Sequence, residues 1–171
     1  MILIIEGSNK AGKSTLINEL KKFHGVHARN SRILNNDTNK DFCSSINMEL
    51  MNARMEAEVQ MLEDLEDLIS EDVLIFDRFH LTEYVYGFKF RGYTNTKMIE
   101  FDKRLADLNA KLILMRSDYE HIENPTEAAQ YIDIQNKMGS IYDLSVMNKS
   151  VYKAETQKDF RDIAKEIIRG L

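Results

Sequence analysis

Residues 7–14 read Gly7-Ser8-Asn9-Lys10-Ala11-Gly12-Lys13-Ser14, a complete G-x-x-x-x-G-K-S sequence. This stretch follows the apolar residues 2–5 directly and opens into a helical pattern over residues 15–22. A buried strand, a glycine-containing turn and a helix N-terminus are the context in which such a loop binds phosphate. The two glycines allow successive backbone N–H groups to point into one concavity, and the helix N-terminus adds positive potential. The sequence therefore predicts a binding site for a nucleoside triphosphate with Mg²⁺.

Two positions of the loop have separate expected roles. We expect the Lys13 ammonium group to reach the β- and γ-phosphates and the Ser14 hydroxyl to hold Mg²⁺. The loop positions expected around the phosphates of ATP are Gly7, Asn9, Lys10, Ala11, Gly12, Lys13, Ser14 and Thr15.

The composition is that of a single globular domain spanning residues 1–171, with 43% hydrophobic and 30% charged residues. A net charge of −5 argues against a general nucleic-acid-binding surface. The single cysteine, Cys43, excludes an internal disulfide and a cysteine-based zinc site, and it fits a reducing cytoplasm. No apolar run has the length of a signal peptide or a membrane span, so we expect a cytoplasmic protein without a membrane partner.

Strand and helix patterns alternate along the chain. Strands are predicted over residues 2–6, 26–30, 73–76, 111–115 and 151–154. Helices are predicted over residues 13–23, 41–70 with a break, a short segment ending at Gly87, 95–108, 125 to about 148, and 158–168. Residues 88–93 form a basic, aromatic stretch that we expect to be an irregular exposed loop. The alternation predicts an α/β fold with a parallel sheet covered by helices on both faces.

Three candidate binding residues, Gly7, Asp77 and Arg116, each follow or end a predicted strand. The carboxyl ends of parallel strands meet at one edge of a sheet, where ligands bind. A carboxylate such as Asp77 can hold Mg²⁺ or its water there, or accept a proton, and the Arg78 guanidinium suits a second phosphate. The alternative for Asp77 is a helix N-cap.

At this point the sequence resembles the thymidylate kinase family of phosphate-loop (P-loop) nucleoside monophosphate kinases. Residues 5–15 match the family's loop, and residues 77–86 (DRFHLTEYVY) are similar to its D-R-[YF]-x-x-S-x-x-A-Y signature, with Thr82 in place of serine. Residues 50–56 resemble the family helix that carries an acceptor-binding arginine. The resemblance implies a three-layer P-loop kinase fold with five parallel strands. It also implies transfer of the γ-phosphoryl group of ATP to a deoxynucleoside monophosphate, a step of deoxynucleotide biosynthesis.

The resemblance also implies roles for individual residues. Lys13, Lys10, Asp77 and Arg78 would be catalytic, and Ser14 and Asp77 would hold Mg²⁺. The acceptor site would consist of Asn9, Leu50, Arg54, Arg78 and Tyr86. For Arg54 alone, the plainer interpretation is an ordinary helix charge paired with Glu58. Either Arg29 or Arg32 would serve as a further arginine near the acceptor.

Several positions depart from the family pattern. Lys10 stands where one branch of the family has a catalytic arginine, and the lid segment, residues 117–130, contains no arginine. We therefore expect Lys10, rather than the lid, to supply charge to the transition state, unless Lys10 is simply a solvated loop residue. Asn9 replaces an acidic residue and Leu50 an aromatic one, so an acceptor other than thymidylate, including a modified base, fits the sequence.

The other histidines and aromatic residues have plainer predicted roles. His24, His27, His80 and His121 show no metal-ligand spacing, and we interpret them as surface or local packing residues. Tyr119 and Arg116 lie where the adenine of ATP could stack, although Arg116 fits a structural role equally well.

Three other functions share parts of this pattern. A deoxynucleoside kinase has the same loop, but residues 26–36 contain no acidic residue to act as its base. A kinase acting on a polynucleotide hydroxyl would use the basic, aromatic residues 89–93. A nucleotide switch would need an N-K-x-D sequence, and residues 148–151 (NKSV) lack the aspartate. The family resemblance further implies a homodimer formed through helices.

Overall fold

The computed structural model describes residues 1–30, 44–65 and 72–170, with six helices and five strands in these ranges. The strands are β1 (Ile2–Glu6), β2 (Val26–Asn30), β3 (Val73–Asp77), β4 (Lys111–Arg116) and β5 (Asn148–Lys153). The helices are α1 (Lys13–Leu20), α2 (Ser44–Asp64), α3 (His80–Arg91), α4 (Met98–Asp107), α5 (Pro125–Leu144) and α6 (Gln157–Arg169).

The strands form one parallel sheet in the order β2-β3-β1-β4-β5. The first strand of the chain, β1, is therefore central, and each of its neighbours is reached through a crossover that contains helices. This arrangement confirms the α/β fold with a five-stranded parallel sheet.

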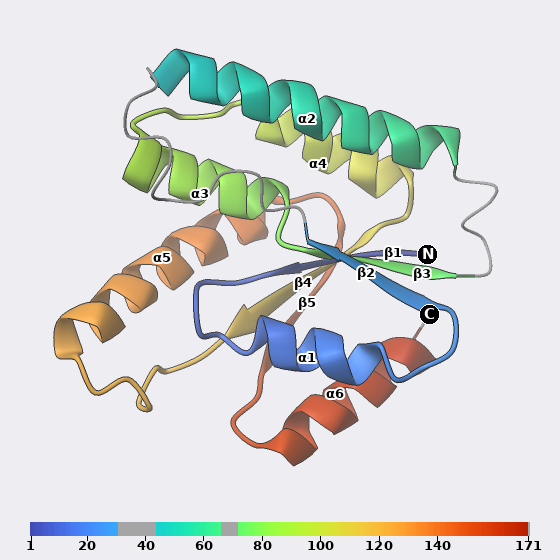
Figure 1. Cartoon of the computed structure of the whole chain (residues 1–171), viewed down its shortest axis with the longest axis vertical. Coiled ribbons are helices and arrows are strands. Elements are labelled where there is room, and N and C mark those ends of the chain that lie inside the picture. Colours follow the sequence, from blue (N-terminus) through green and yellow to red (C-terminus); the bar gives the residue numbers. More distant parts are fainter. Residues whose placement is uncertain (31–43, 66–71, 171) are drawn as a thin grey trace.

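Successive side chains of the central strand β1 point to opposite faces of the sheet and pack into two separate cores. Ile2 and Ile4 pack into the core beneath α2, α3, α4 and α5, whereas Leu3 and Ile5 pack into the core beneath α1 and α6. Figure 1 shows the resulting three layers, with α1 and α6 on one face of the sheet and the other four helices on the opposite face. Because both faces are covered, all of β1 is buried, and its first four residues are apolar.

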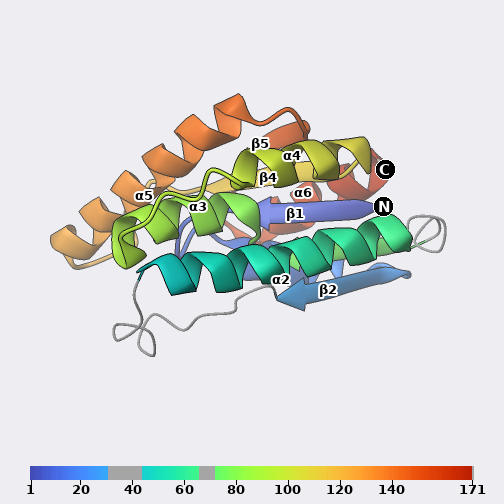
Figure 2. The ribbon, with the colours of Figure 1, turned by 90° about the horizontal axis from the view of Figure 1, so that it is seen from above.

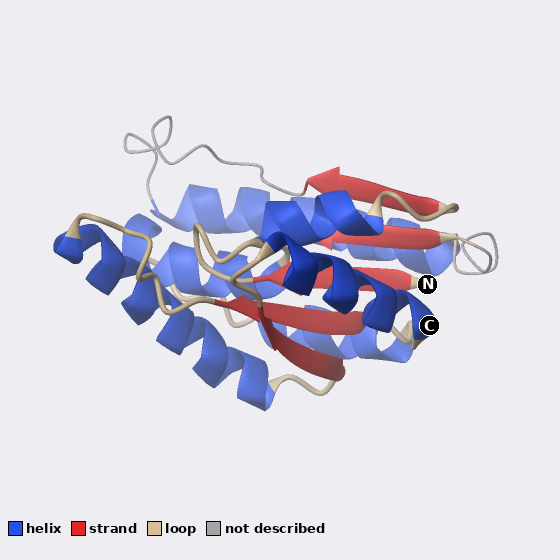
Figure 3. Ribbon diagram, turned by 90° about the horizontal axis from the view of Figure 1, so that it is seen from below, coloured by secondary structure: helices blue, strands red, loops and turns tan. Residues whose placement is uncertain are grey.

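The carboxyl ends of the strands point away from both chain termini. Figures 2 and 3 show the N- and C-terminal ends together at one edge of the molecule, with the loops after β1, β3 and β4 at the opposite edge. Registers that pair Ile5 with Asp77 and Glu6 with Leu114 bring the ends of these three strands together. The predicted meeting of Gly7, Asp77 and Arg116 at one edge is thus confirmed.

Several predicted boundaries were wrong, and among them α1 ends at Leu20 rather than at residue 23 and α4 begins at Met98 rather than at residue 95. Helix α3 continues through Gly87 to Arg91, so most of the stretch expected to be an irregular loop is helical and Tyr93 after it is buried. Helix α5 ends at Leu144, and β5 begins at Asn148, three residues before the predicted start of that strand. The ends of the helix predicted over residues 41–70 lie outside the described residues; α2 occupies Ser44–Asp64.

Within the described residues, no helix is long and apolar enough to span a membrane.

Candidate active site

The loop between β1 and α1 depends on two glycines with positive φ. Gly7 has a φ of 146°, and a Cβ there would lie 2.5 Å from the carbonyl oxygen of Met115. Gly12 has a φ of 87°, and a Cβ there would lie 2.6 Å from the Phe160 ring. Any side chain at either position would collide with β4 or α6, so the loop can pack against these elements only with glycine.

The lysine of the loop folds back over the loop itself. Lys13 is buried, and its Nζ donates a hydrogen bond to the carbonyl oxygen of Ser8 at 2.6 Å. Ser14 and Lys10 are exposed, and Lys10 has a φ of 62°. The Ser8 side chain forms a hydrogen bond with the Tyr119 hydroxyl, which links the loop to the segment after β4. The ammonium group and the hydroxyl that were predicted to bind donor phosphates and Mg²⁺ thus begin the same helix.

A glutamate holds the start of α3 against the end of β1. Glu6 is fully buried, and its Oε1 accepts hydrogen bonds from the backbone N–H groups of Phe79 (2.8 Å), Leu81 (3.1 Å) and Thr82 (3.2 Å). The Thr82 hydroxyl donates to the other carboxylate oxygen. A carboxylate at a helix N-terminus satisfies otherwise unpaired N–H groups and interacts favourably with the helix dipole. Glu6 therefore fixes the Asp77-Arg78 turn beside the loop, a role that the sequence analysis missed.

Asp77 and Arg78 leave β3 in a constrained turn. Arg78 has a φ of 70° and is 4% exposed, and its Nη2 donates to Asn9 Oδ1 at 2.5 Å. Its guanidinium carbon lies 5.5 Å from the centre of the Tyr86 ring. The Oδ1 atom of Asp77 is buried and has no hydrogen-bond partner among the described residues. Asn9, Arg78 and Tyr86, all predicted to face the acceptor, therefore lie together.

Two cavities open beside the loop. One, of about 250 Å³, is lined by Asn9, Lys10, Gly12, Lys13, Ser14, Thr15, Arg78 and His121. The other, of about 410 Å³, is lined by Lys10, Gly12, Thr15, Ser117, Asp118, Glu120, His121, Ala154, Glu155 and Phe160. The first joins the phosphate loop to Arg78, and the second extends from the loop toward the segment between β5 and α6. His121 borders both cavities, although the sequence analysis interpreted it only as a surface or packing residue.

The predicted acceptor residues on α2 lie outside these two cavities. Arg54 Nε lies 3.1 Å from Glu58 Oε1, and Arg29 approaches the same oxygen at 3.5 Å. Glu58 is buried, so the plainer expectation of an Arg54–Glu58 pair is confirmed. Leu50 is exposed. Arg32, the alternative to Arg29, lies outside the described residues.

Two buried tyrosines lie close to the loop and to Arg78: Tyr119 bonds to Ser8, and the Tyr86 ring lies against the Arg78 guanidinium. Tyr119 is buried, and its ring centre lies 5.6 Å from that of Tyr131. Tyr119 is not among the residues that line the cavity beside Ala154, and its stacking on adenine stays a prediction. Burial raises the pKa of Tyr119, which keeps its hydroxyl protonated at neutral pH. The hydroxyl of Tyr86 is buried without a hydrogen-bond partner among the described residues.

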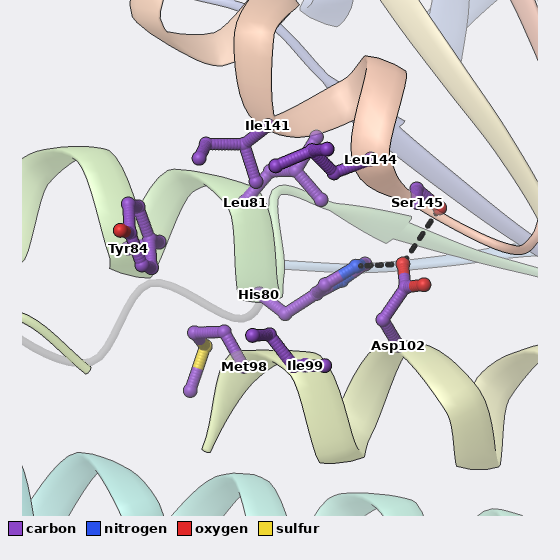
Figure 4. Close-up of a pocket in the computed structure, with 9 residues that line it drawn as sticks. All are labelled: His80, Leu81, Tyr84, Met98, Ile99, Asp102, Ile141, Leu144 and Ser145. Carbon is purple, nitrogen blue, oxygen red and sulfur yellow. Dashed lines mark hydrogen bonds and ion pairs between the residues drawn. The ribbon is translucent and has the colours of Figure 1, made fainter. Parts of the chain in front are cut away.

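A third cavity, of about 290 Å³, lies away from the loop between α3, α4 and α5. Figure 4 shows its mostly apolar wall and, at one side, His80, Asp102 and Ser145. His80 Nε2 lies 2.9 Å from Asp102 Oδ1, to which Ser145 Oγ also donates at 2.7 Å. His80 is thus a buried packing residue that ties three helices together.

The residues at the strand ends fit a magnesium ion held together with a nucleotide. In the described part of the chain, no group of three or more His, Cys, Asp or Glu side chains could hold a metal ion alone. Mg²⁺ in phosphate-transfer sites is usually bound by one or two protein oxygens, with substrate phosphates and water as the other ligands. The orphaned Asp77 Oδ1 and the exposed Ser14 hydroxyl provide this kind of donor set.

The whole chain superposes on two solved nucleotide-binding structures. The YorR protein from Bacillus subtilis, in complex with phosphorylated GDP, matches 99% of this chain and 94% of its own, with a TM-score of 0.66 and 18% identity. Thymidylate kinase from Ehrlichia chaffeensis matches 99% of this chain and 97% of its own, with a TM-score of 0.66 and 16% identity. No protein-family model and no curated protein matches the sequence. The chain therefore has a thymidylate-kinase-like fold of the P-loop kinase type.

Proposed function

We propose that the protein is a nucleotide kinase that uses ATP and Mg²⁺ to phosphorylate a deoxynucleoside monophosphate to the diphosphate. One observation carries the proposal: Lys13 from the phosphate loop and Arg78 from the end of β3 line the same cavity. Two cationic side chains from separate strand ends suit two phosphate groups that must meet. The similarity to thymidylate kinase and to YorR supports the same class of reaction.

In the proposed reaction, an oxygen of the acceptor phosphate bonds to the γ-phosphorus of ATP while the bond from that phosphorus to the bridging oxygen breaks. The electron pair of the broken bond stays with ADP. Lys13 would hold the β- and γ-phosphates, and Arg78 would hold the acceptor phosphate in line with them. Mg²⁺, held by Ser14 and Asp77, would neutralise charge on the phosphates of ATP.

The acceptor sugar would lie beside Tyr86. The ring of Tyr86 packs against Phe90, with ring centres 5.3 Å apart, and its hydroxyl is buried. This wall is suited to reject the extra hydroxyl of a ribonucleotide, which supports a deoxynucleotide acceptor. Arg54 would provide the second cation of the acceptor clamp, in competition with its ion pair to Glu58.

The test is to incubate the protein with Mg²⁺–ATP and each deoxynucleoside monophosphate, ribonucleoside monophosphate and deoxynucleoside in turn. Products are separated by anion-exchange chromatography, with Lys13→Ala as the inactive control. We expect ADP and a deoxynucleoside diphosphate in equal amounts. Transfer only to free deoxynucleosides would establish a deoxynucleoside kinase instead, and labelling of an oligonucleotide alone would establish a polynucleotide kinase.

Two further expectations concern the state of the protein. The single cysteine suits a reducing cytoplasm. The family resemblance suggests a homodimer, which light scattering of the purified protein would detect.

A further inference from the structure

His121 occupies an unusual place for a residue of the segment between β4 and α5. The two cavities beside the loop share Lys10, Gly12, Thr15 and His121. Three of these residues belong to the phosphate loop and the first turn of α1, whereas His121 reaches the same region from across the cleft. His121 therefore borders the space that the phosphates of ATP would occupy.

The segment that carries His121 is anchored at three points. The Gln135 side chain on α5 forms hydrogen bonds with both the backbone N–H (2.8 Å) and the carbonyl oxygen (2.9 Å) of Ser117. Lys153 at the end of β5 donates to Asp118 at 2.9 Å. The Tyr119 hydroxyl bonds to Ser8 in the loop. These ties hold the segment beside the loop.

A turn directs His121 toward the cleft. Tyr119 has a φ of 65°, in the left-handed region that non-glycine residues rarely adopt, and its carbonyl oxygen accepts from the Ile122 N–H at 3.0 Å. The rings of Tyr119 and His121 are 6.2 Å apart. The buried tyrosine thus points to the loop while the exposed histidine two residues later borders both cavities.

The charged groups around His121 come from four elements. The cations are Lys10 and Lys13 in the loop and α1, and Arg78 at the end of β3; the acids are Asp118, Glu120 and Glu155. Lys153 pairs with both Asp118, at 2.9 Å, and Glu155, at 2.8 Å, so these two carboxylates share its one positive charge. The cavity that Lys13 and Arg78 both line has cations and no acid in its wall, so it favours an anion.

We propose that His121 is a catalytic residue that donates a hydrogen bond from its protonated imidazole to the γ-phosphoryl group during transfer. The inference rests on the proposed kinase function and extends it, because the sequence assigned transition-state charge to Lys10 alone. Residues 117–130 contain no arginine, and His121 provides a cationic donor from this segment in its place. The imidazole keeps its proton throughout. The phosphorus–oxygen bond to ADP breaks and the bond to the acceptor oxygen forms, while His121 offsets charge on the oxygens that move.

Three variants test whether the positive charge of His121, or only the presence of a polar side chain at this position, matters for transfer. The turnover number is measured from pH 5.5 to 9 at saturating ATP and acceptor for wild type, His121→Gln and His121→Arg. The matched control is His24→Gln, an exposed histidine that borders none of the three cavities described. A nearby polyphosphate favours the charged form of an imidazole, so the pH series distinguishes a role that needs this charge from one that does not.

We expect His121→Gln to lower kcat by about 100-fold near pH 6.5 with the KM for ATP changed less than threefold. His121→Arg should retain activity and lose the decline of kcat at alkaline pH, because a guanidinium remains charged. Ionisation of the substrates affects kcat of both proteins equally. Dividing the wild-type kcat by the His121→Arg kcat at each pH therefore cancels this effect. Wild-type kcat and pH dependence in His121→Gln would overturn the inference.

A second measurement does not need the acceptor. The carbon chemical shift of the His121 ring is followed by NMR across the same pH range, with and without Mg²⁺–ATP. A titration midpoint that rises on addition of Mg²⁺–ATP supports the contact, and an unchanged midpoint refutes it. A wild-type protein that phosphorylates no monophosphate would instead refute the proposed function, so the two failures are distinguishable.

Discussion

Arg78 combines a strained backbone with a buried side chain that has specific partners. Its φ of 70° is unfavourable for a residue with a Cβ, and such residues persist where surrounding contacts determine the conformation. Here the Arg78 N–H donates to the Ile5 carbonyl at 3.0 Å, while the guanidinium reaches Asn9 from a position over Tyr86. We interpret the strain as part of placing a planar cation at the cleft.

We predict that Arg78→Lys lowers kcat/KM for the acceptor by about 10- to 100-fold and leaves the KM for ATP unchanged. Lysine keeps the charge but cannot form the two parallel hydrogen bonds of a guanidinium with phosphate. Steady-state kinetics with each substrate varied in turn measure the effect. Arg161→Lys on the exposed part of α6 is the control, and an equal loss for both substrates would contradict a role limited to the acceptor.

For Arg54 we predict that replacement by alanine raises the KM for the acceptor about 10-fold and lowers the melting temperature. Glu58 is buried, and without Arg54 the ion pair that it keeps among the described residues is the longer one, to Arg29 at 3.5 Å. Loss of one partner of a buried charge is destabilising. Gln60→Ala on the same helix should change neither quantity; an unchanged acceptor KM in Arg54→Ala would leave Arg54 with its structural pair alone.

For individual residues, the sequence predicted contacts between neighbours along the chain and missed contacts between residues that are far apart in sequence. Arg54 and Glu58 are four residues apart on a helix, so their contact follows from the helical repeat. The partners of Glu6 lie 73 to 76 residues away, and no local pattern specifies them. A buried carboxylate at the end of an apolar strand was the available signal, since an unpaired charge would be very unfavourable there.

At the scale of elements, Gly87 shows why α3 was predicted too short. Glycine often ends a helix, but this one lies inside α3 because the Tyr93 ring packs against it. A Cβ on Gly87 would lie 2.6 Å from Tyr93 Cε2. Tyr93 is held by hydrogen bonds with Glu83 and Arg91, so the ring cannot easily move away.

A pair of glycine replacements tests this explanation. We predict that Gly87→Ala destabilises the protein by about 1–3 kcal/mol through overpacking. Gly139→Ala in α5 should instead stabilise it by about 0.5–1 kcal/mol, because a Cβ there meets nothing within 4 Å and alanine favours the helix. Urea unfolding gives both values, and destabilisation of similar size in the two variants would refute the packing argument.

Strand β5 shows a second reason for boundary errors. It lies at the edge of the sheet, and none of its residues is fully buried, so it lacks the apolar run that marks β1 and β4. Its first residues, Asn148 and Lys149, resemble a loop. Pairing with Lys111 and Leu112 of β4, rather than composition, extends the strand to them.

At the scale of the whole molecule, Asp102 connects three helices and the segment that leads into β5. It lies on α4 and accepts hydrogen bonds from His80 on α3, from Ser145 at the end of α5, and from the Val146 N–H at 2.8 Å. Burial acts to raise the pKa of Asp102, but these hydrogen bonds outweigh burial and hold the pKa below the ordinary value of 3.8. The carboxylate therefore stabilises the fold above pH 3.8, and this contribution is lost as the pH falls below that value.

We predict that Asp102→Asn lowers the free energy of unfolding by about 2 kcal/mol at pH 7 and that the difference from wild type shrinks below pH 3.8. Denaturant titrations of both proteins at pH 7, 5 and 3 provide the comparison. Glu49→Gln, an exposed change on α2, should be neutral throughout. A difference between Asp102→Asn and wild type that is constant across this range would show that the charge of Asp102 is not involved.

The overall architecture could be predicted because β1, β3 and β4 are apolar segments with helical patterns between them. The candidate site could be predicted in part, since Lys13, Asp77 and Arg78 follow from motifs. His121 could not, because its position depends on the turn at Tyr119 and on contacts with Gln135, Lys153 and Ser8. Such contacts join residues that are distant in sequence and carry no repeating pattern.

The central position of β1 has a consequence for synthesis of the protein. Ile2 pairs with Leu74 and Leu3 with Lys111, so β1 has no neighbour in the sheet until β3 and β4 have been made. During that interval its apolar side chains are exposed to water and to other nascent chains. The loop that follows β1 acquires its shape only when β4 brings Met115 against Gly7. The proposed nucleotide site therefore forms only after β4 has been made, and a chaperone that shields β1 during synthesis would act before any ligand can.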